Sequence, residues 1–260
     1  MSSTPAAPVP FEAPAAWQRI ELLSDLHLSE STPRTTAAFL AHLRASRADA
    51  ILLLGDVLEV WVGDDVLGQP GFERSLFDAL AETAQARWIG FMPGNRDFLL
   101  GDRALAEAGL HALADPLCLQ AWGQRWLLTH GDALCLADTD YQAFRRQVRS
   151  PQWQAGMLAL PLAQRLETGR RMREASEARK HSSTPESYAD VDLPASLAWL
   201  QQAGTDQLIH GHTHRPGSEP WGAGERHVLS DWDFDAHPAR GDVLVLTPAG
   251  LQREPVAAGT

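Results

Sequence analysis

Cysteine is scarce in this sequence, and long apolar runs are missing. The 260 residues include only two cysteines, Cys118 and Cys135, whose positions match neither a structural zinc site nor a redox pair. No apolar run approaches the roughly 18 residues that a membrane-spanning helix needs, and no basic segment leads into an apolar one as in a signal peptide. We therefore expect a globular chain with free thiols in a reducing cytosol.

Positive charge is also in short supply, which argues against general nucleic-acid binding. The formal net charge is −11 and the sequence pI is about 5.3, whereas nucleic-acid binding favours a basic surface. Hydrophobic residues make up 44% of the chain and charged residues 21%, as in soluble enzymes. Because the first residues are rich in alanine and proline, we expect a disordered extension over residues 1–17 and one domain over residues 18–260.

The sequence does contain a set of short apolar runs that each stop at a residue able to bind a metal. The runs at residues 20–24, 51–54, 88–92, 126–129 and 207–209 predict buried strands. Predicted helices at residues 35–47, 72–86 and 102–108 lie among them, which indicates an α/β fold. The side chains with metal-binding atoms after these strands are Asp25 and His27, Asp56, Asn95, His130, and His210 with His212.

These side chains would converge if the strands shared a sheet and a direction, because ligands bind at the carboxyl ends of parallel strands. Seven ligands are too many for one cation and suit two, with Asp56 as the bridge. Mixed oxygen and nitrogen donors suit Mn²⁺, iron or Zn²⁺, and the lack of cysteine ligands argues against structural zinc. Taken alone, Gly55-Asp56 is more typical of a turn, and the acidic pair Asp64-Asp65 is better explained as a solvated turn or helix cap.

Together, the motifs resemble the calcineurin-like metallophosphoesterase superfamily. They are Asp-x-His at 25 and 27, Gly-Asp at 55 and 56, Gly-Asn at 94 and 95, His-Gly at 130 and 131, and Gly-His-x-His at 211–214. The resemblance implies a four-layer α/β/β/α sandwich that carries two metal ions. It also implies the ligand sets, which are Asp25, His27, Asp56 and His212 for one ion, and Asp56, Asn95, His130 and His210 for the other.

Longer stretches resemble one family within that superfamily, the UDP-2,3-diacylglucosamine pyrophosphohydrolases of lipid A synthesis. They fall within residues 24–28, 55–65, 93–99, 130–135, 138–145 and 209–216. The resemblance implies an enzyme with two Mn²⁺ ions, in which a metal-activated water attacks the α-phosphorus of UDP-2,3-diacylglucosamine. The products would be UMP and 2,3-diacylglucosamine 1-phosphate, which is lipid X.

The roles of single residues follow from the same resemblance. Family substrate contacts match Asn95, Arg96, Asp138, Ser176 and His210. Lys180 is the candidate for a further positively charged substrate contact, in the helical cap described below. Many metallophosphoesterases carry a histidine at the position of Arg96, where it acts as a general acid. An arginine fits a pyrophosphate substrate, because the phosphate leaving group needs little protonation and the transferring phosphoryl group needs charge stabilisation. The catalytic set implied is Asp56, Asn95, Arg96 and His210.

Residues 141–180 differ from the rest of the chain in charge. They include nine basic and three acidic residues, although the whole chain has a net charge of −11. Two explanations are open from the residues themselves. The segment forms helices packed on the core with solvated basic faces, or it forms a helical cap at about 138–192 that holds acyl chains and faces diphosphate and anionic lipids. The resemblance favours the cap.

A cap of this kind predicts the partners and the location of the protein. We expect a monomer that takes an acylated nucleotide sugar, binds no nucleic acid, and associates peripherally with the cytoplasmic face of the inner membrane. One alternative is a soluble nucleotide or dinucleoside polyphosphate phosphohydrolase of the same superfamily, which would have an open site. The other is a non-catalytic metal-binding scaffold, which is disfavoured because every ligand position is filled.

Overall fold

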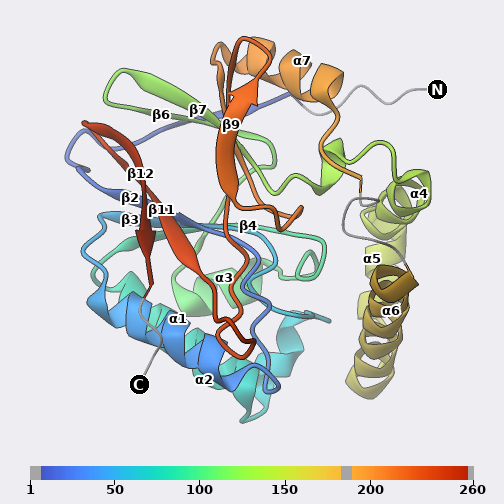
Figure 1. The fold of residues 1–260 in the computed structure, drawn as a ribbon. Helices are drawn as coiled ribbons and strands as arrows, with labels where there is room; N and C mark the ends of the chain where they lie inside the picture. The colour runs from blue at the N-terminus through green and yellow to red at the C-terminus, as the bar shows by residue number, and fades with distance from the viewer. Residues whose placement is uncertain (1–6, 183–188, 257–260) are drawn as a thin grey trace.

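Two six-stranded sheets form the centre of the computed structural model, which describes residues 7–182 and 189–256 (Figure 1). The first sheet has the strand order β12-β11-β2-β3-β4-β5, and the second has the order β1-β6-β7-β8-β10-β9. The strands of the first sheet are β2 (Ile20–Leu23), β3 (Ala50–Leu54), β4 (Trp88–Met92), β5 (His111–Ala112), β11 (Asp242–Thr247) and β12 (Gly250–Pro255). Those of the second are β1 (Val9–Glu12), β6 (Leu117–Ala121), β7 (Gln124–Thr129), β8 (Gln207–His210), β9 (Gly217–Trp221) and β10 (Gly224–Val228).

The central strand β3 is buried on both of its faces, as its unbroken apolar run predicts. Successive side chains of a strand point to opposite faces. Leu52 and Leu54 therefore share a buried cluster with Ile209 of the second sheet. The alternate residues Ile51 and Leu53 belong to a different cluster, which they share with the helices on the outer face.

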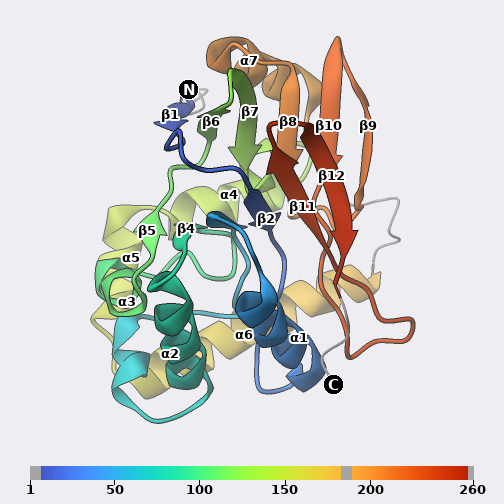
Figure 2. The ribbon, with the colours of Figure 1, turned by 90° about the vertical axis from the view of Figure 1, so that its left-hand side faces the viewer.

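Helices cover both outer faces of the paired sheets, which gives four layers (Figure 2). The first sheet is covered by α1 (Pro33–Ala45), α2 (Phe72–Ala84) and α3 (Asp102–Ala108), and the second by α7 (Leu193–Ala203). Phe39 of α1 and Phe77 of α2 are almost completely buried against the first sheet. The arrangement confirms the expected α/β/β/α fold.

All five predicted strands are present, but they do not share one sheet. β2, β3 and β4 run parallel to one another in the first sheet, whereas β7 and β8 are parallel neighbours in the second. The condition that one sheet collects all the strand ends is therefore not met, and strand ends of both sheets meet instead. Hydrophobic runs show that a strand is buried, but they carry no information about which strands pair.

Residues 7–17 are ordered, so the prediction of a disordered extension is wrong for this part. β1 pairs in parallel with β6, and Phe11 lies 6.2 Å from Trp17 and 5.2 Å from Trp88 between ring centroids. The cause is aromatic packing, which stabilises an edge strand despite the proline within it. Residues 1–6, which the same prediction included, lie outside the described part of the chain.

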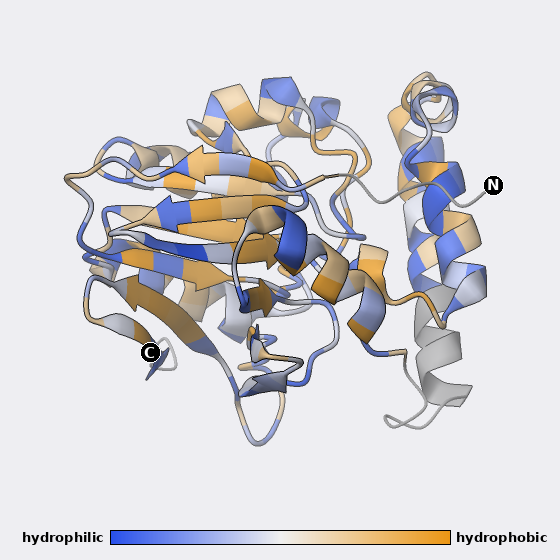
Figure 3. Ribbon diagram, turned by 90° about the horizontal axis from the view of Figure 1, so that it is seen from above, coloured by the Kyte–Doolittle hydropathy of each residue, from blue (hydrophilic) through white to orange (hydrophobic). Residues whose placement is uncertain are grey.

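Three helices stand beside the sandwich, at the right of Figure 1. They are α4 (Thr139–Val148), α5 (Pro151–Leu158) and α6 (Leu162–Ser182). Hydropathy colouring shows many hydrophilic residues along them, in contrast to the apolar strands (Figure 3). Among the described residues, no helix is long and apolar enough to cross a membrane.

Candidate metal centre and substrate pocket

The chain turns sharply where β2 and β3 end. Asp25, His27 and Asp56 have φ angles of 55°, 47° and 53°, in the left-handed region that residues other than glycine rarely adopt. Backbone hydrogen bonds hold the two turns together, from Asp25 N to Gly55 O (3.1 Å) and from His27 N to Asp56 O (3.0 Å). Such strain is typical of functional sites, and it places these side chains side by side.

Glycine allows the next loop to approach Asp56. A Cβ atom at Gly94 would lie 2.2 Å from Asp56 Oδ1, and one at Gly55 would lie 2.6 Å from Gly94 Cα. Because neither position tolerates a side chain, the loop after β4 packs directly against the end of β3. Arg96 N then donates to Asp56 Oδ1 at 2.8 Å, which places Asn95 beside Asp56.

His130, after β7, brings the second sheet into the site. Its Nδ1 lies 2.9 Å from Leu54 O, so this nitrogen carries the proton and donates to the carbonyl. Its Nε2 lies 3.1 Å from Asn95 Oδ1 and 3.7 Å from Asp56 Oδ1. Nε2 therefore faces the oxygen atoms of Asn95 and Asp56, in the orientation that a metal ligand requires.

His210 and His212 complete the cluster from the end of β8. His210 Nδ1 lies 2.8 Å from Gly211 O, while its buried Nε2 has no hydrogen-bond partner among the described residues. His212 N donates to Asp25 Oδ2 at 2.9 Å, and the His212 ring lies 5.2 Å from the ring of His130. All seven predicted ligand residues thus meet at one rim of the sandwich.

The donor atoms of this rim fit metal ions. Oxygen or nitrogen atoms of Asp25, Asp56 and His130 lie within 4.8 Å of one another, as do those of Asp25, His27 and His214. A buried imidazole nitrogen without a partner, such as Nε2 of His210, is costly unless it binds something. The mixture of carboxylate, amide and imidazole donors suits a transition metal.

Local electrostatics also favour cations. Burial lowers the pKa of His210 and of His212 to about 4, so both are neutral at pH 7, as metal binding requires. Burial acts the same way on His130, but the carboxylates of Asp56 and Asp25 outweigh it and raise the pKa to about 9. Negative charge is therefore concentrated at the centre of the rim.

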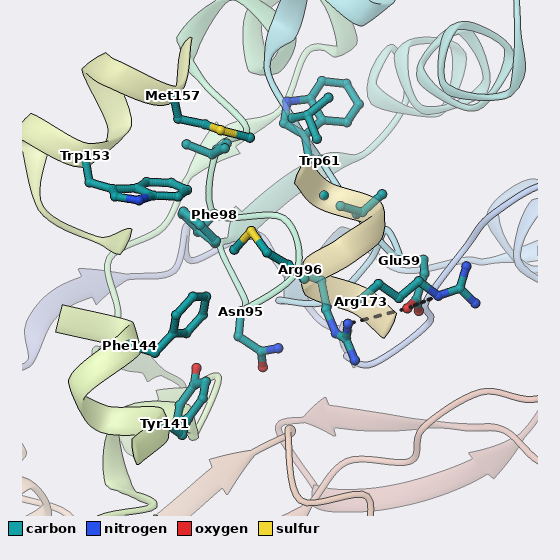
Figure 4. Close-up of a pocket in the computed structure, with 15 residues that line it drawn as sticks. Glu59, Trp61, Asn95, Arg96, Phe98, Tyr141, Phe144, Trp153, Met157 and Arg173 are labelled. Carbon is teal, nitrogen blue, oxygen red and sulfur yellow. Dashed lines mark ion pairs between the residues drawn. The ribbon is translucent and has the colours of Figure 1, made fainter. Parts of the chain in front are cut away.

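A pocket opens beside this rim, between the sandwich and the three extra helices (Figure 4). The cavity has a volume of about 180 Å³ and is partly open to solvent. Its polar lining is Glu59, Asn95, Arg96, Tyr141 and Arg173, and its apolar lining includes Trp61, Phe98, Phe144, Trp153, Met157 and Met172. Since Asn95 belongs to both the pocket and the rim, a ligand in the pocket can reach the metal centre.

Comparison with known proteins agrees with this site. The family model of the calcineurin-like phosphoesterases matches residues 19–216. This chain belongs to that family. A UDP-2,3-diacylglucosamine hydrolase of Ralstonia nicotianae is 46% identical over 247 residues, which cover 91% of this chain and 92% of that protein. The hydrolase of the same name from Chromobacterium violaceum is 41% identical, with 91% of this chain and 98% of that protein covered. Both levels of the resemblance in the motifs are confirmed.

The predicted substrate residues of this phosphoesterase lie in surroundings that differ from one residue to the next. Arg96 lines the pocket, whereas exposed Asp138 accepts a hydrogen bond from Tyr141 N (2.9 Å) at the start of α4 and is not part of the described lining. Ser176 and Lys180 belong to the end of α6, where the side chains lie outside the described residues. The structure therefore does not test the predictions for Ser176 and Lys180.

Two side chains of this phosphoesterase site were given no role of their own in the sequence-based prediction. His214 lies 3.3 Å from Asp25 Oδ1 and 3.4 Å from His27 Nε2, measured from its Nε2 atom. Its position two residues after His212 was the available signal. Asp97 accepts hydrogen bonds from Gly94 N and Val57 N, both at 2.8 Å, and so joins the loops after β3 and β4. Burial and the nearby Asp56 raise the pKa of Asp97 to about 6.

Hydrogen bonds and ion pairs attach the extra helices to the phosphoesterase sandwich. Buried Asp132 accepts from Tyr141 Oη (2.6 Å) and Arg145 Nε (2.7 Å) of α4. Asp65 pairs with Arg165 of α6. Its neighbour Asp64 accepts from Gly101 N and Ala104 N and caps α3. The acidic pair is therefore structural, as expected, although its partners come from distant parts of the chain.

Proposed function

We propose that this phosphoesterase hydrolyses the pyrophosphate bond of UDP-2,3-diacylglucosamine, which releases UMP and 2,3-diacylglucosamine 1-phosphate in lipid A biosynthesis. The observation that carries the proposal is the pocket, whose polar side adjoins the metal rim and whose larger side is apolar. An acylated nucleotide sugar needs both halves, because its phosphates carry charge and its acyl chains avoid water. A soluble dinucleotide would use only the polar half.

We assign two Mn²⁺ ions to the rim. Asp25, His27, Asp56 and His212 would hold one ion, and Asp56, Asn95, His130 and His210 the other. When bound, such ions activate water and neutralise charge on phosphate oxygens.

The protein's own groups orient the substrate in this proposal. Arg96 presents a guanidinium, which suits a phosphate, and its side chain is 10% exposed within the pocket lining. Its backbone N–H holds Asp56 in place at 2.8 Å. No general acid is required from Arg96, because the sugar phosphate that leaves is already a weak base.

We infer that residues 18–260 act as one catalytic domain, with residues 138–192 inserted as a cap. The apolar side chains of α4, α5 and α6 would hold the acyl chains, and Asp138, Ser176 and Lys180 would contact the polar part of the substrate. Phe98 and Trp153, whose ring centroids lie 6.1 Å apart, come from the sandwich and the cap and face each other across the apolar part.

The basic surface of α6 supports a location at the membrane. Arg170 and Arg171 are 59% and 73% exposed, although Glu167 offsets part of their charge through ion pairs. We propose that a monomer binds peripherally to anionic lipids on the cytoplasmic face of the inner membrane, where its acylated substrate resides.

Mass spectrometry of the products tests the reaction. The wild-type protein and Asp56→Asn are incubated with UDP-2,3-diacylglucosamine and Mn²⁺, and in parallel with a dinucleoside polyphosphate. UMP and the diacylated sugar 1-phosphate should form with the wild type alone. Turnover of the dinucleotide only would instead support a soluble phosphohydrolase, and no turnover of either substrate would support a non-catalytic scaffold.

A further inference from the structure

Glu59 lies between the metal rim and the cap. Its side chain is only 10% exposed, and three basic groups from separate parts of the chain surround it, of which Figure 4 shows Arg96 and Arg173. They are His27 at the end of β2, Arg96 in the loop after β4, and Arg173 of α6. A buried carboxylate needs such partners, because burial without them disfavours its charge.

The two oxygen atoms of Glu59 have different neighbours. Oε2 lies 3.1 Å from Nδ1 of His27. Oε1 lies 3.0 Å from Nε of Arg173 and 3.6 Å from Nη1 of Arg96. One oxygen therefore faces the metal centre, while the other faces the cap and the pocket.

The backbone fixes Glu59 beside His27. Leu28 and Leu58 form a parallel bridge beyond the ends of β2 and β3. Leu28 N donates to Val57 O at 2.9 Å, and Glu59 N donates to Leu28 O at 3.1 Å. Glu59 and His27 thus belong to one hydrogen-bonded unit of the sandwich, whereas Arg173 approaches from a separate helix.

The carboxylate of Glu59 also faces the His27 ring at ion-pair distance, without the alignment of a hydrogen bond to Nδ1. Because Nδ1 faces the carboxylate, Nε2 points toward Asp56, at 3.8 Å from Oδ2. Histidines that bind metals commonly have a carboxylate on the second nitrogen, which fixes the ring and its tautomer. Any movement of the Glu59 side chain would therefore change the orientation of the predicted metal ligand His27.

We propose that Glu59 is a positioning residue that couples attachment of the cap to metal binding. When α6 is in place, Arg173 holds the Glu59 carboxylate against His27. When a bound metal ion orders His27, the carboxylate in turn stays within reach of Arg173. The coupling is reciprocal, so metal binding stabilises α6 and loss of Arg173 weakens metal binding. The inference rests on the proposed function for the assignment of His27 as a Mn²⁺ ligand and of α6 as part of a cap.

Two measurements on the metal-free full-length protein test this coupling. Calorimetric titration gives the Mn²⁺ affinity, and hydrogen exchange of residues 165–174 reports on α6 before and after Mn²⁺ is added. Glu59→Gln should weaken Mn²⁺ binding about 10- to 100-fold. Arg173→Gln, which leaves His27 untouched, should weaken it about fivefold or more, and Mn²⁺ should slow exchange in wild-type α6 by the same factor.

The matched control is Glu174→Gln. It makes the same chemical change as Glu59→Gln, and it lies in α6 next to Arg173. Glu174 pairs with Arg170 on the exposed face, so its loss should change neither measurement. An unchanged Mn²⁺ affinity in Arg173→Gln would overturn the coupling, as would equal protection of α6 by Mn²⁺ in the wild type and Glu59→Gln. Arg173 is 43% exposed, so its variant keeps the test valid even if Glu59→Gln fails to fold. Neither measurement uses substrate, so a failure of the proposed reaction would be seen separately, as an absence of UMP.

Discussion

Replacing Arg165 with methionine should loosen α6 without unfolding the sandwich. Arg165 is 3% exposed, and its guanidinium joins α6 to the loop after β3. Nη1 donates to Val62 O at 2.6 Å and to Asp65 Oδ1 at 2.8 Å, and Nε donates to Leu160 O at 2.9 Å. Methionine retains much of the apolar stem but supplies none of these donors.

The size of the effect follows from the surroundings of each acceptor. The bond to buried Val62 O is charge-assisted, and its loss removes about 1.5–3 kcal/mol. Asp65 is 52% exposed, so its ion pair adds only about 0–1 kcal/mol after solvent screening. A total of about 3 kcal/mol should raise local opening of α6 about a hundredfold.

Hydrogen exchange of the amides at residues 165–174 measures this opening. Arg165→Met should exchange about a hundred times faster there than the wild type, with strands β3 and β4 unchanged. Asp65→Asn is the control, and it should accelerate exchange less than tenfold because water already solvates that carboxylate. Protection of α6 within threefold of wild type in Arg165→Met would show that apolar packing, not this arginine, holds the helix.

Three further predictions concern catalysis, membrane binding and stability. Asp56→Ala should lower turnover with Mn²⁺ at least about a hundredfold while the thermal midpoint stays within a few degrees, and near-normal turnover would exclude a bridging role. Changing Arg170 and Arg171 together to Glu should weaken binding to anionic vesicles by about 1 kcal/mol or more for each charge, measured by sedimentation against neutral vesicles. Equal partitioning of both proteins would reject a membrane role for this face. The hydrogen-bond and ion-pair partners of buried Glu21 outweigh the effect of burial and lower its pKa. The ionised carboxylate therefore stabilises the fold at pH values above the pKa that Glu21 has in the unfolded chain. This contribution is lost as the pH falls through the pKa that Glu21 has in the folded protein. Glu21→Gln should therefore be less stable than wild type by about 1–3 kcal/mol at pH 7 in urea unfolding, with a gap that closes in acid; a gap independent of pH would contradict this.

The apolar runs and the residues that follow them were enough to predict an α/β fold and the composition of the rim, whereas the four-layer arrangement was implied only by the family resemblance of the motifs. Strands such as β3 are buried on both faces, so their sequence is apolar throughout and easily recognised. β9 was not predicted, because it lies at an edge with largely exposed residues. β1 was missed for a similar reason, since its alternating pattern contains Pro10.

Long-range partners within the site could not be predicted from the sequence. Nothing in the local pattern shows that Asp97 holds two loops together, or that Glu59 meets an arginine more than a hundred residues away. Asp65 looked like a solvated turn residue, because its partner Arg165 belongs to a separate basic segment. Such contacts depend on how α4, α5 and α6 fold back against the sandwich.

The pocket also bears on the thermal stability of the folded chain. Trp61 and Met157, which line it, also belong to the main buried cluster beneath α1 and α2, and Phe98 and Trp153 pack against that cluster. The pocket thus continues the hydrophobic core, and α4, α5 and α6, which polar contacts attach to the sandwich, close it on one side. An acyl chain in this space would complete the core, so an apolar ligand should raise the thermal midpoint in proportion to the surface it buries.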